Sequence, residues 1–194
     1  MNIQKIINSK TEKIGKKIEY YKQITSTHQI SKQKAKKFEN NGTIIIAEQQ
    51  TQGIGTKGRS WYTGEENNIA MTIIIKPKCT IDKIEGITIK IAELIKQSVK
   101  ELYTYDLEIK YPNDLLLNGK KICGILTQVA TISERIDYLL ISIGFNVNEI
   151  NFSEETIKLA TSLKKEYGKV FSREDIIIKF IEKLEKYLIS KNIM

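Results

Sequence analysis

The chain has 194 residues, enough for one domain with a hydrophobic core, and no apolar run approaches the ~20 residues that a membrane-spanning helix needs. Its first 17 residues are polar and basic and are not a secretory signal, so the cytosol is the expected location. Cys79 and Cys123 are therefore expected to be free, buried thiols. Two cysteines and a single histidine make a zinc site unexpected. The net charge of +8, from 31 basic and 23 acidic residues, comes from lysines spread along the chain, which fits an anionic small ligand as well as a nucleic acid.

Strand and helix signals alternate irregularly along the chain. Residues 1–17 lack a clean apolar face and are expected to be a short helix or a frayed lead-in, and residues 25–27 form a cap or turn cluster. Apolar, β-branched or turn-bounded segments predict strands at 18–21, 43–47, 68–76, 108–111, 114–117, 121–129 and 137–146. Periodic or capped segments predict helices at 29–38, 84–102, 153–163 and 173–190.

The fold class follows from how these segments are joined. Asn118-Gly119, between two strands, is the strongest hairpin signal in the chain. The spacing Gly-x-Gly-x-x-Gly at 53–58 matches a dinucleotide-binding turn, but the residues after it are a poor crossover helix, so that fold is rejected. We predict one domain over residues 1–194, of α+β class, with a mixed, mainly antiparallel sheet flanked by helices.

A glycine-rich loop follows the strand at 43–47 and is the most informative segment. Residues 53–61 read Gly-Ile-Gly-Thr-Lys-Gly-Arg-Ser-Trp. The three glycines let the backbone approach a ligand and present N–H groups, and Lys57 and Arg59 add charge suited to phosphate. The loop therefore predicts an anion-binding site, against the alternative of a plain solvated loop.

Three later segments support the same site. In residues 110–114, Lys-Tyr-Pro-Asn-Asp, a proline places a lysine at a strand end beside a polar turn, where the lysine can neutralise developing negative charge. Gly124 interrupts an otherwise good strand, which often marks close approach of a ligand. Cys123 beside it is expected to be a core residue and not a nucleophile. Residues 144–148, Gly-Phe-Asn-Val-Asn, can supply amide contacts at a strand end.

In this order, the segments resemble the motifs of the catalytic domain of biotin protein ligases. The family motifs are Ser-Thr-Asn, Gly-Arg-Gly-Arg-x-Gly-Arg-x-Trp, Lys-Trp-Pro-Asn-Asp, Lys-Leu-x-Gly-Ile-Leu and Gly-x-Asn-Val-Asn. Their counterparts here lie at 26–28, 53–61, 110–114, 121–126 and 144–148, and residues 160–163, Ala-Thr-Ser-Leu, match a family helix start. The resemblance runs from about Tyr20 to the end of the chain, and the fold it implies is the one shared with class II aminoacyl-tRNA synthetases.

The resemblance implies a two-step reaction that uses ATP, Mg²⁺ and biotin. The biotin carboxylate attacks the α-phosphate of ATP to give biotinyl-5′-AMP, and a lysine of a biotin carboxyl-carrier domain then takes the biotin and releases AMP. By the same analogy, the expected catalytic residues are Lys110 and Arg59. The expected biotin-binding residues are Ser26, Thr27, His28, Gln50, Gly53, Ile54, Gly55, Thr56, Lys110 and Gly124. The expected nucleotide-binding residues are Lys57, Arg59, Trp61, Asn113 and Asn146, with Asp114 as a further candidate near nucleotide or Mg²⁺.

The chain departs from the family pattern at three positions. Ile54 and Thr56 stand where the family often has arginines, the second of which is tied to retention of the adenylate. The threonine therefore suggests that biotinyl-AMP leaks, unless Lys57 compensates. His28 replaces an asparagine, and a positional, hydrogen-bonding role is favoured over that of a catalytic base.

Several alternatives stay open from the sequence. A lipoate ligase or octanoyl transferase shares the fold, a degenerate ligase would bind biotin without catalysis, and a nucleic-acid-binding module is the third class. We expect neither the helix-turn-helix nor the SH3-like domain of many relatives, no specific DNA and no membrane as partners, and a monomer or a homodimer.

Overall fold

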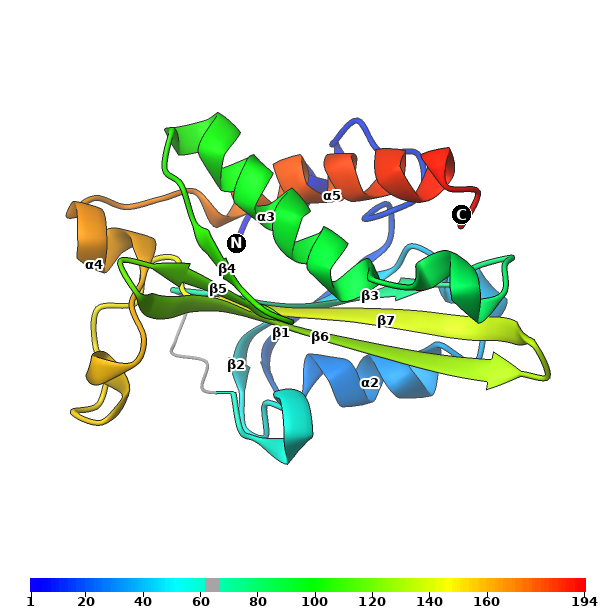
Figure 1. The fold of residues 1–194 in the computed structure, drawn as a ribbon, viewed down its shortest axis with the longest axis horizontal. Helices are drawn as coiled ribbons and strands as arrows, with labels where there is room; N and C mark the ends of the chain where they lie inside the picture. Colours follow the sequence, from blue (N-terminus) through cyan, green and yellow to red (C-terminus); the bar gives the residue numbers. More distant parts are fainter. Residues whose placement is uncertain (62–66) are drawn as a thin grey trace.

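Strand pairing organises this protein. Its computed structural model describes residues 1–61 and 67–194, except for the side chains of Glu39 and Lys57. In that part of the chain, seven strands form one sheet in the order β1-β2-β3-β7-β6-β5-β4 (Figure 1). The strands are β1 (Ile18–Ile24), β2 (Ile44–Gln50), β3 (Ile69–Ile75), β4 (Glu108–Lys110), β5 (Asp114–Leu117), β6 (Lys120–Ile132) and β7 (Arg135–Phe145). Only β1 and β2 run parallel among these pairs, which confirms the predicted mixed, mainly antiparallel sheet.

Helices cover both faces of this sheet. The α-helices are α1 (Ile3–Ile7), α2 (Thr27–Lys34), α3 (Ile87–Tyr103), α4 (Leu163–Tyr167) and α5 (Arg173–Ser190), and single 3₁₀ turns are η1 (Phe38–Asn40), η2 (Thr56–Gly58), η3 (Ile81–Ile84) and η4 (Thr156–Lys158). Helices α3 and α5 lie over one face and α2 lies under the other (Figure 1). None of the helices in the described part of the chain has the length and apolar composition needed to cross a membrane.

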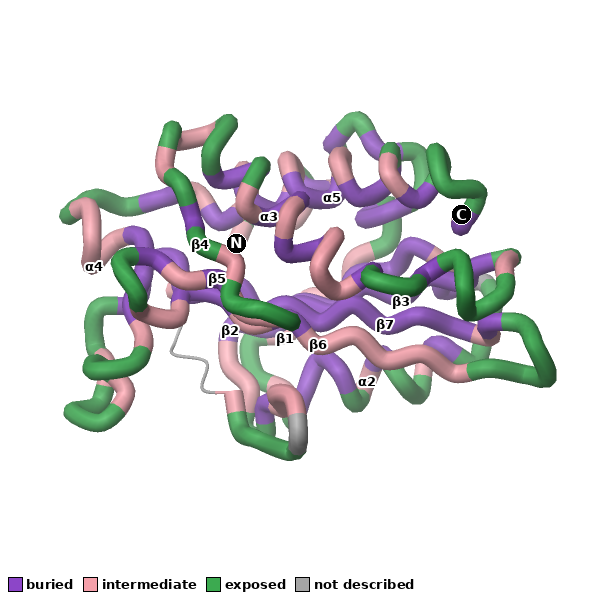
Figure 2. The backbone as a smooth tube through the Cα atoms, in the orientation of Figure 1, coloured by how far each residue is buried: buried purple, intermediate pink, exposed green. Residues whose placement is uncertain are grey.

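The central strands are buried on both sides, as Figure 2 shows. In β3, Ile73 and Ile75 join the main core with α3 and α5, whereas Ile74 packs with Ala35 and Leu140 in a smaller cluster on the side of α2. Because both faces are covered, these strands read as continuous apolar runs and not as alternating patterns.

The predicted hairpin is confirmed between β5 and β6. Asn118 and Gly119 adopt φ values of 52° and 75°, which is the pair of positive φ angles that a type I′ turn requires. The N-terminal limits of two helices are less well predicted: α3 begins at Ile87 and not at residue 84, and α2 occupies Thr27–Lys34 and not 29–38. The helix Arg173–Ser190 with its Ser172 cap is confirmed, and the Ser172 side chain accepts a hydrogen bond from Asp175 N.

The predicted helix over 153–163 is wrong. The chain forms only the η4 turn there, and residues 159–161 run beside β6, where Ala160 pairs with Lys121 and Thr161 N donates to Lys121 O at 2.9 Å. Backbone pairing with the sheet edge satisfies these groups in place of a helix. Ser162 then caps α4, which begins at Leu163 as the family motif predicts.

The N-terminal segment is folded onto the domain and is not frayed. Ile6 and Ile14 are fully buried, and the Glu185 carboxylate of α5 accepts hydrogen bonds from the backbone N–H groups of Glu12, Lys13 and Ile14. Three donors on one carboxylate fix this segment against the helix. The expected short helix is confirmed as α1, whereas the alternative of a frayed lead-in is wrong because Ile6 and Ile14 are buried in the core.

A buried ion pair joins the sheet to the start of α5. The Glu48 carboxylate of β2 is 3% exposed and is bidentate with the Arg173 guanidinium, and it also accepts a hydrogen bond from Tyr20 Oη at 2.7 Å. Burial alone would raise the pKa of Glu48, but the hydrogen bonds from Arg173 and Tyr20 outweigh it and hold the pKa below its ordinary value.

Candidate active site

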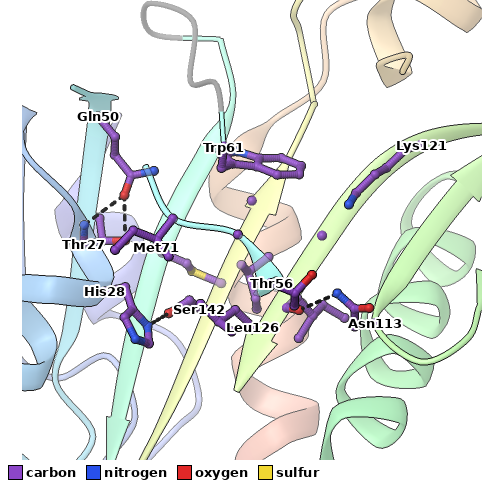
Figure 3. Close-up of a pocket in the computed structure, with 16 residues that line it drawn as sticks. Thr27, His28, Gln50, Thr56, Trp61, Met71, Asn113, Lys121, Leu126 and Ser142 are labelled. Atoms are coloured by element: carbon purple, nitrogen blue, oxygen red, sulfur yellow. Dashed lines mark hydrogen bonds between the residues drawn. The ribbon is translucent and has the colours of Figure 1, made fainter. Parts of the chain in front are cut away.

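A pocket opens on the α2 face of the sheet, between α2, the glycine loop and the ends of β6 and β7 (Figure 3). Its empty space is about 430 Å³, including the part open to solvent. Side chains from segments far apart in sequence meet here, among them Thr27, Gln50, Trp61, Lys121 and Ser142.

Gly124 and Gly144 line the floor of the pocket, within a row of cross-strand partners that runs across the sheet. Ala47, Ala70, Gly144, Gly124 and Asp114 are successive cross-strand partners on β2, β3, β7, β6 and β5. Cross-strand partners point to the same face, so the row is flat where side chains would otherwise stand. The two glycines leave room for a planar group directly on the backbone.

In this structure the Trp61 ring lies on that floor. A Cβ added at Gly144 would come within 2.2 Å of the Trp61 ring, and one added at Gly124 within 2.8 Å. Trp61 Nε1 is buried and has no hydrogen-bond partner within the described residues. The indole therefore fills the space that the two glycines leave above the sheet.

Polar groups gather at the end of the pocket nearest α2. Gln50 Oε1 accepts hydrogen bonds from Thr27 N at 2.9 Å and Thr27 Oγ1 at 3.1 Å (Figure 3). The imidazole of His28 is bound on both sides, with Nδ1 2.8 Å from Ser142 Oγ and Nε2 2.7 Å from Gln128 Oε1. Burial lowers the pKa of His28 below its ordinary value, although the Gln128 contact partly opposes that effect.

A cation stands at the opposite side of the pocket. Lys121 Nζ lies 2.7 Å from Asp114 Oδ1 and 5.4 Å from the centre of the Trp61 ring. The side chains of Lys121 and Asp114 are 30% and 17% exposed, so the pair is partly shielded from water. The site thus has hydrogen-bonding groups at one end, a flat floor in the middle and a lysine at the other end.

The glycine loop closes on itself beside the pocket. Trp61 N donates to Gly53 O at 2.9 Å and Gly55 N to Arg59 O at 2.6 Å, which returns the chain to its starting point. A Cβ at Gly53 would come within 2.3 Å of the Trp61 carbonyl oxygen, so the narrow neck requires glycine there. The Arg59 side chain folds back on the loop and donates to Thr56 Oγ1 at 3.1 Å.

Comparison with known proteins agrees with this geometry. Residues 20–148 match the Biotin/lipoate A/B protein ligase family. The chain belongs to this family. The resemblance read from the motifs is therefore confirmed at family level.

Individual relatives show how far along the chain the likeness extends. The bifunctional ligase/repressor BirA of Bacillus subtilis is 34% identical over 170 residues, covering 87% of this chain and 52% of that protein. A biotin–[acetyl-CoA-carboxylase] ligase of Paracoccus denitrificans is 31% identical over 114 residues, covering 53% of this chain and 43% of that protein. The chain thus spans about half the length of the curated relatives it matches.

A solved structure of the family also superposes well. The biotin protein ligase of Aquifex aeolicus in complex with biotin and ATP gives a TM-score of 0.72 at 25% identity, covering 89% of this chain and 72% of that one. A LipL1 of Plasmodium falciparum in complex with lipoate gives a TM-score of 0.58 at 12% identity, which shows the fold alone. The predicted fold class is therefore confirmed.

The structure brings most of the expected site residues of the family to this one pocket. The lining residues among them are Thr27, His28, Gln50, Ile54, Gly55, Thr56, Trp61, Asn113 and Gly124. Their roles stay predictions, but their convergence from five separate segments of the chain makes this pocket the site to test.

Other expected residues lie outside the lining. Ser26 is fully buried, and the buried Asn146 side chain donates to Thr161 O, where it fixes the segment before α4. Gly53 forms the neck of the loop, and the exposed Arg59 is folded onto Thr56. Lys110 is exposed at the end of β4, as the cross-strand partner of Asp114. The side chain of Lys57 lies outside the described residues.

Sequence reasoning missed three lining residues of consequence: Lys121, Ser142 and Gly144. Lys121 was inside a recognised motif, but in a regular strand a residue three before Gly124 points to the opposite face, and the bulge in the β5–β6 pairing is what brings Lys121 to the pocket side. Ser142 carried no signal, because an isolated serine in a strand is ordinary. Gly144 was noted at a strand end, but its pairing with Gly124 is a matter of sheet register.

Proposed function

We propose that this chain attaches biotin to a lysine of an acceptor protein, through a biotinyl-5′-AMP intermediate formed from biotin and ATP. The observation that carries the proposal is the arrangement of the pocket, with the Thr27–Gln50 pair and the Lys121 cation at opposite ends of the glycine floor. Membership of the family and the likeness to a biotin- and ATP-bound ligase support it.

The polar end suits the head group of biotin. A ureido group offers one carbonyl acceptor and two N–H donors, and the pocket presents the hydroxyl, amide and imidazole groups of Thr27, Gln50 and His28. Lipoate and octanoate have no polar group at that end, so they would gain no hydrogen bonds from these side chains. This asymmetry favours biotin over the other acids that the family handles.

The cationic end suits the chemistry. The first step brings a carboxylate against the α-phosphate of ATP, and two anions approach each other only where positive charge offsets their repulsion. We assign Lys121 to this role because it lines the pocket, and we propose that Lys110 and Arg59, which lie outside the lining, contact the nucleotide. The second step transfers biotin to the amine of the acceptor lysine, with AMP as the leaving group.

A magnesium ion is compatible with the residues at this end. Within the described residues, no three His, Cys, Asp or Glu side chains gather to form a metal site by themselves. Mg²⁺ commonly uses one or two carboxylates together with substrate phosphates, and the Asp114 carboxylate with the neighbouring Asn113 amide provides such oxygen donors. When bound there with ATP, the ion would neutralise phosphate charge.

Biotin-dependent exchange of pyrophosphate into ATP tests the proposal directly, with lipoate and octanoate in parallel. Exchange with biotin alone supports adenylation of biotin; exchange with lipoate or octanoate alone assigns the chain to the sister activity. No exchange by folded protein, together with retained binding of biotin, would identify a degenerate binding protein. We take the acceptor to be a biotin carboxyl-carrier domain and the location to be the cytosol. These two parts of the proposal are tested separately.

A further inference from the structure

The indole ring of Trp61 lies in the part of the pocket that a substrate would have to cross. A Cβ added at Gly144 would come within 2.2 Å of the ring and one added at Gly124 within 2.8 Å, so the ring rests directly on the backbone of the floor. Figure 3 shows the ring between Gln50 at one end of the pocket and Lys121 at the other. A molecule that reaches from one end to the other therefore meets the indole.

The side chain of Lys121 covers a further part of the same floor. A Cβ at Gly124 would come within 3.2 Å of Lys121 Cε and within 3.3 Å of Nζ. Nζ also lies 5.4 Å from the centre of the Trp61 ring, a distance at which an ammonium group is attracted to an aromatic face. The two side chains therefore occupy the floor together, and each stabilises the position of the other.

The position of the ring also has an unfavourable side. Trp61 Nε1 is buried and has no hydrogen-bond partner within the described residues. An indole N–H group can only donate, and in water it would donate to a water molecule. Burial of the apolar ring thus favours this position, whereas the unpaired donor opposes it, and the two effects are of similar size. A substrate that takes the floor therefore displaces the ring at a small cost in free energy.

The ring can leave the floor while the glycine loop keeps its shape. The loop is closed by backbone groups, since Trp61 N donates to Gly53 O at 2.9 Å and Gly55 N donates to Arg59 O at 2.6 Å. Neither of these hydrogen bonds involves the indole. Rotation about the side-chain bonds of Trp61 moves the ring to another rotamer and leaves both bonds intact.

We propose that Trp61 limits the substrate affinity of this pocket as an internal competitor: its indole occupies the glycine floor in the free protein, and substrate binding requires the ring to leave. This inference rests on the proposed function, in which biotin extends from the polar end of the pocket to Lys121. When only a fraction of the molecules has an open floor, the apparent affinity for the substrate is reduced by that fraction. Departure of the ring also frees Lys121 from the indole as the anionic substrate arrives.

Biotin affinity of Trp61 variants, measured by calorimetry without nucleotide, tests the competition. We expect Trp61→Ala to bind biotin about 10-fold more tightly than the unsubstituted protein, as for a floor that the ring covers in about nine molecules of ten. Trp61→Phe keeps an aromatic ring at this position and is expected to gain less than about 3-fold. Phe38→Ala is the matched control, because Phe38 is 63% exposed and lies outside the pocket lining, so its loss should leave biotin affinity unchanged.

Fluorescence reports the movement of the ring directly, because Trp61 is the only tryptophan in the chain. Saturation of the unsubstituted protein with biotin is expected to shift the emission to longer wavelength and to increase quenching by acrylamide, because the indole passes from the floor into water. Both changes should follow the binding curve obtained by calorimetry. Emission that stays unchanged, or that shifts to shorter wavelength, at saturating biotin would overturn the proposal. This measurement does not depend on the folding of any variant.

The Trp61 variants separate competition from an ordinary contact with the substrate. A ring that packs against bound biotin would make Trp61→Ala bind biotin more weakly, and that result, or an unchanged affinity, would overturn the proposal. Binding by Trp61→Ala alone would support it. If neither protein binds biotin, the proposed function fails, and acrylamide quenching of the free, unsubstituted protein decides the inference: a shielded indole supports the covered floor and a fully accessible one refutes it.

Discussion

Lys121 and Asp114 form an ion pair at one end of the pocket, with 2.7 Å between Nζ and Oδ1. The pair joins Asp114, the first residue of β5, to Lys121, the second residue of the neighbouring strand β6. Asp114 neutralises the lysine in the absence of substrate, and an incoming anion would have to share or replace that contact. The pair is therefore the point at which binding of an anionic substrate changes the charge balance of the site.

Substitution of Lys121 and of Lys110 tests which of these two lysines stabilises the developing charge. We expect Lys121→Ala to lower kcat/KM for biotin-dependent pyrophosphate exchange by about 10²-fold or more, the usual cost of removing one group that stabilises developing charge. Lys110→Ala is expected to cost less than about 10-fold, because Lys110 lies outside the pocket lining. Lys120→Ala is the control for loss of positive charge, because Lys120 is the neighbouring residue, is partly buried outside the pocket lining and donates to Ile157 O. A loss in Lys110→Ala equal to that in Lys121→Ala would return the principal role to Lys110.

The glycine floor can be probed through the fluorescence of Trp61, the only tryptophan in the chain. A methyl group at Gly144 would occupy space within 2.2 Å of the indole, so Gly144→Ala is expected to displace the ring toward water and shift its emission to longer wavelength. The same variant should lose most of its biotin affinity. Gly119→Asn is the control, because a Cβ there meets no atom within 4 Å and asparagine tolerates positive φ. Unchanged emission in Gly144→Ala would show that Trp61 does not rest on the floor in solution.

Stability at low pH should depend on the buried Glu48–Arg173 pair. The pKa of Glu48 is lowered from its ordinary 4.5, so its contribution to the free energy of unfolding is complete above that pH and is lost as the pH falls through the lower, folded-state pKa. At pH 7, Glu48→Gln leaves Arg173 without its charge partner and should cost about 3–5 kcal/mol. Urea unfolding at pH 7 and in the acid range checks both statements.

Two comparisons make that measurement specific. The difference between Glu48→Gln and the unsubstituted protein should shrink as the pH falls from 4.5 through the lower, folded-state pKa, because the carboxyl is protonated first in the unfolded protein and only then in the folded one. Glu101→Gln, which breaks a more exposed set of ion pairs with Lys179 and Lys183, should cost less than about 1 kcal/mol. An equal cost for the two variants at pH 7 would contradict the importance of the buried pair.

Retention of the intermediate depends on Thr56 if the proposed function holds. Thr56 lines the pocket where relatives often have arginine, and a charge-assisted hydrogen bond contributes about 1.5–3 kcal/mol. Thr56→Arg is therefore expected to slow release of biotinyl-AMP by about 10–100-fold, measured by trapping the released intermediate. An unchanged release rate would refute the leak, and faster release in Lys57→Ala would show that Lys57 already compensates.

Local patterns were enough for most of the fold. The Asn118-Gly119 turn and the Ser172 cap were predicted with their boundaries because turn and cap chemistry depends on a few adjacent residues. The failure at 153–163 arose where backbone groups pair with Lys121, some forty residues away. The helical pattern of that segment competes with backbone pairing to β6, and the local sequence contains no sign of that pairing.

The sequence by itself determined the family, the α+β class and the segments that contribute residues to the candidate pocket, because these follow from short motifs and from periodicity. Only the tertiary structure decided which member of each motif faces the pocket. Sheet register places Gly144 beside Gly124, the bulged β5–β6 pairing turns Lys121 toward Asp114, and α2 brings His28 onto Ser142. These relations join residues distant in the chain, and their energies depend on burial and direction, which no local pattern contains.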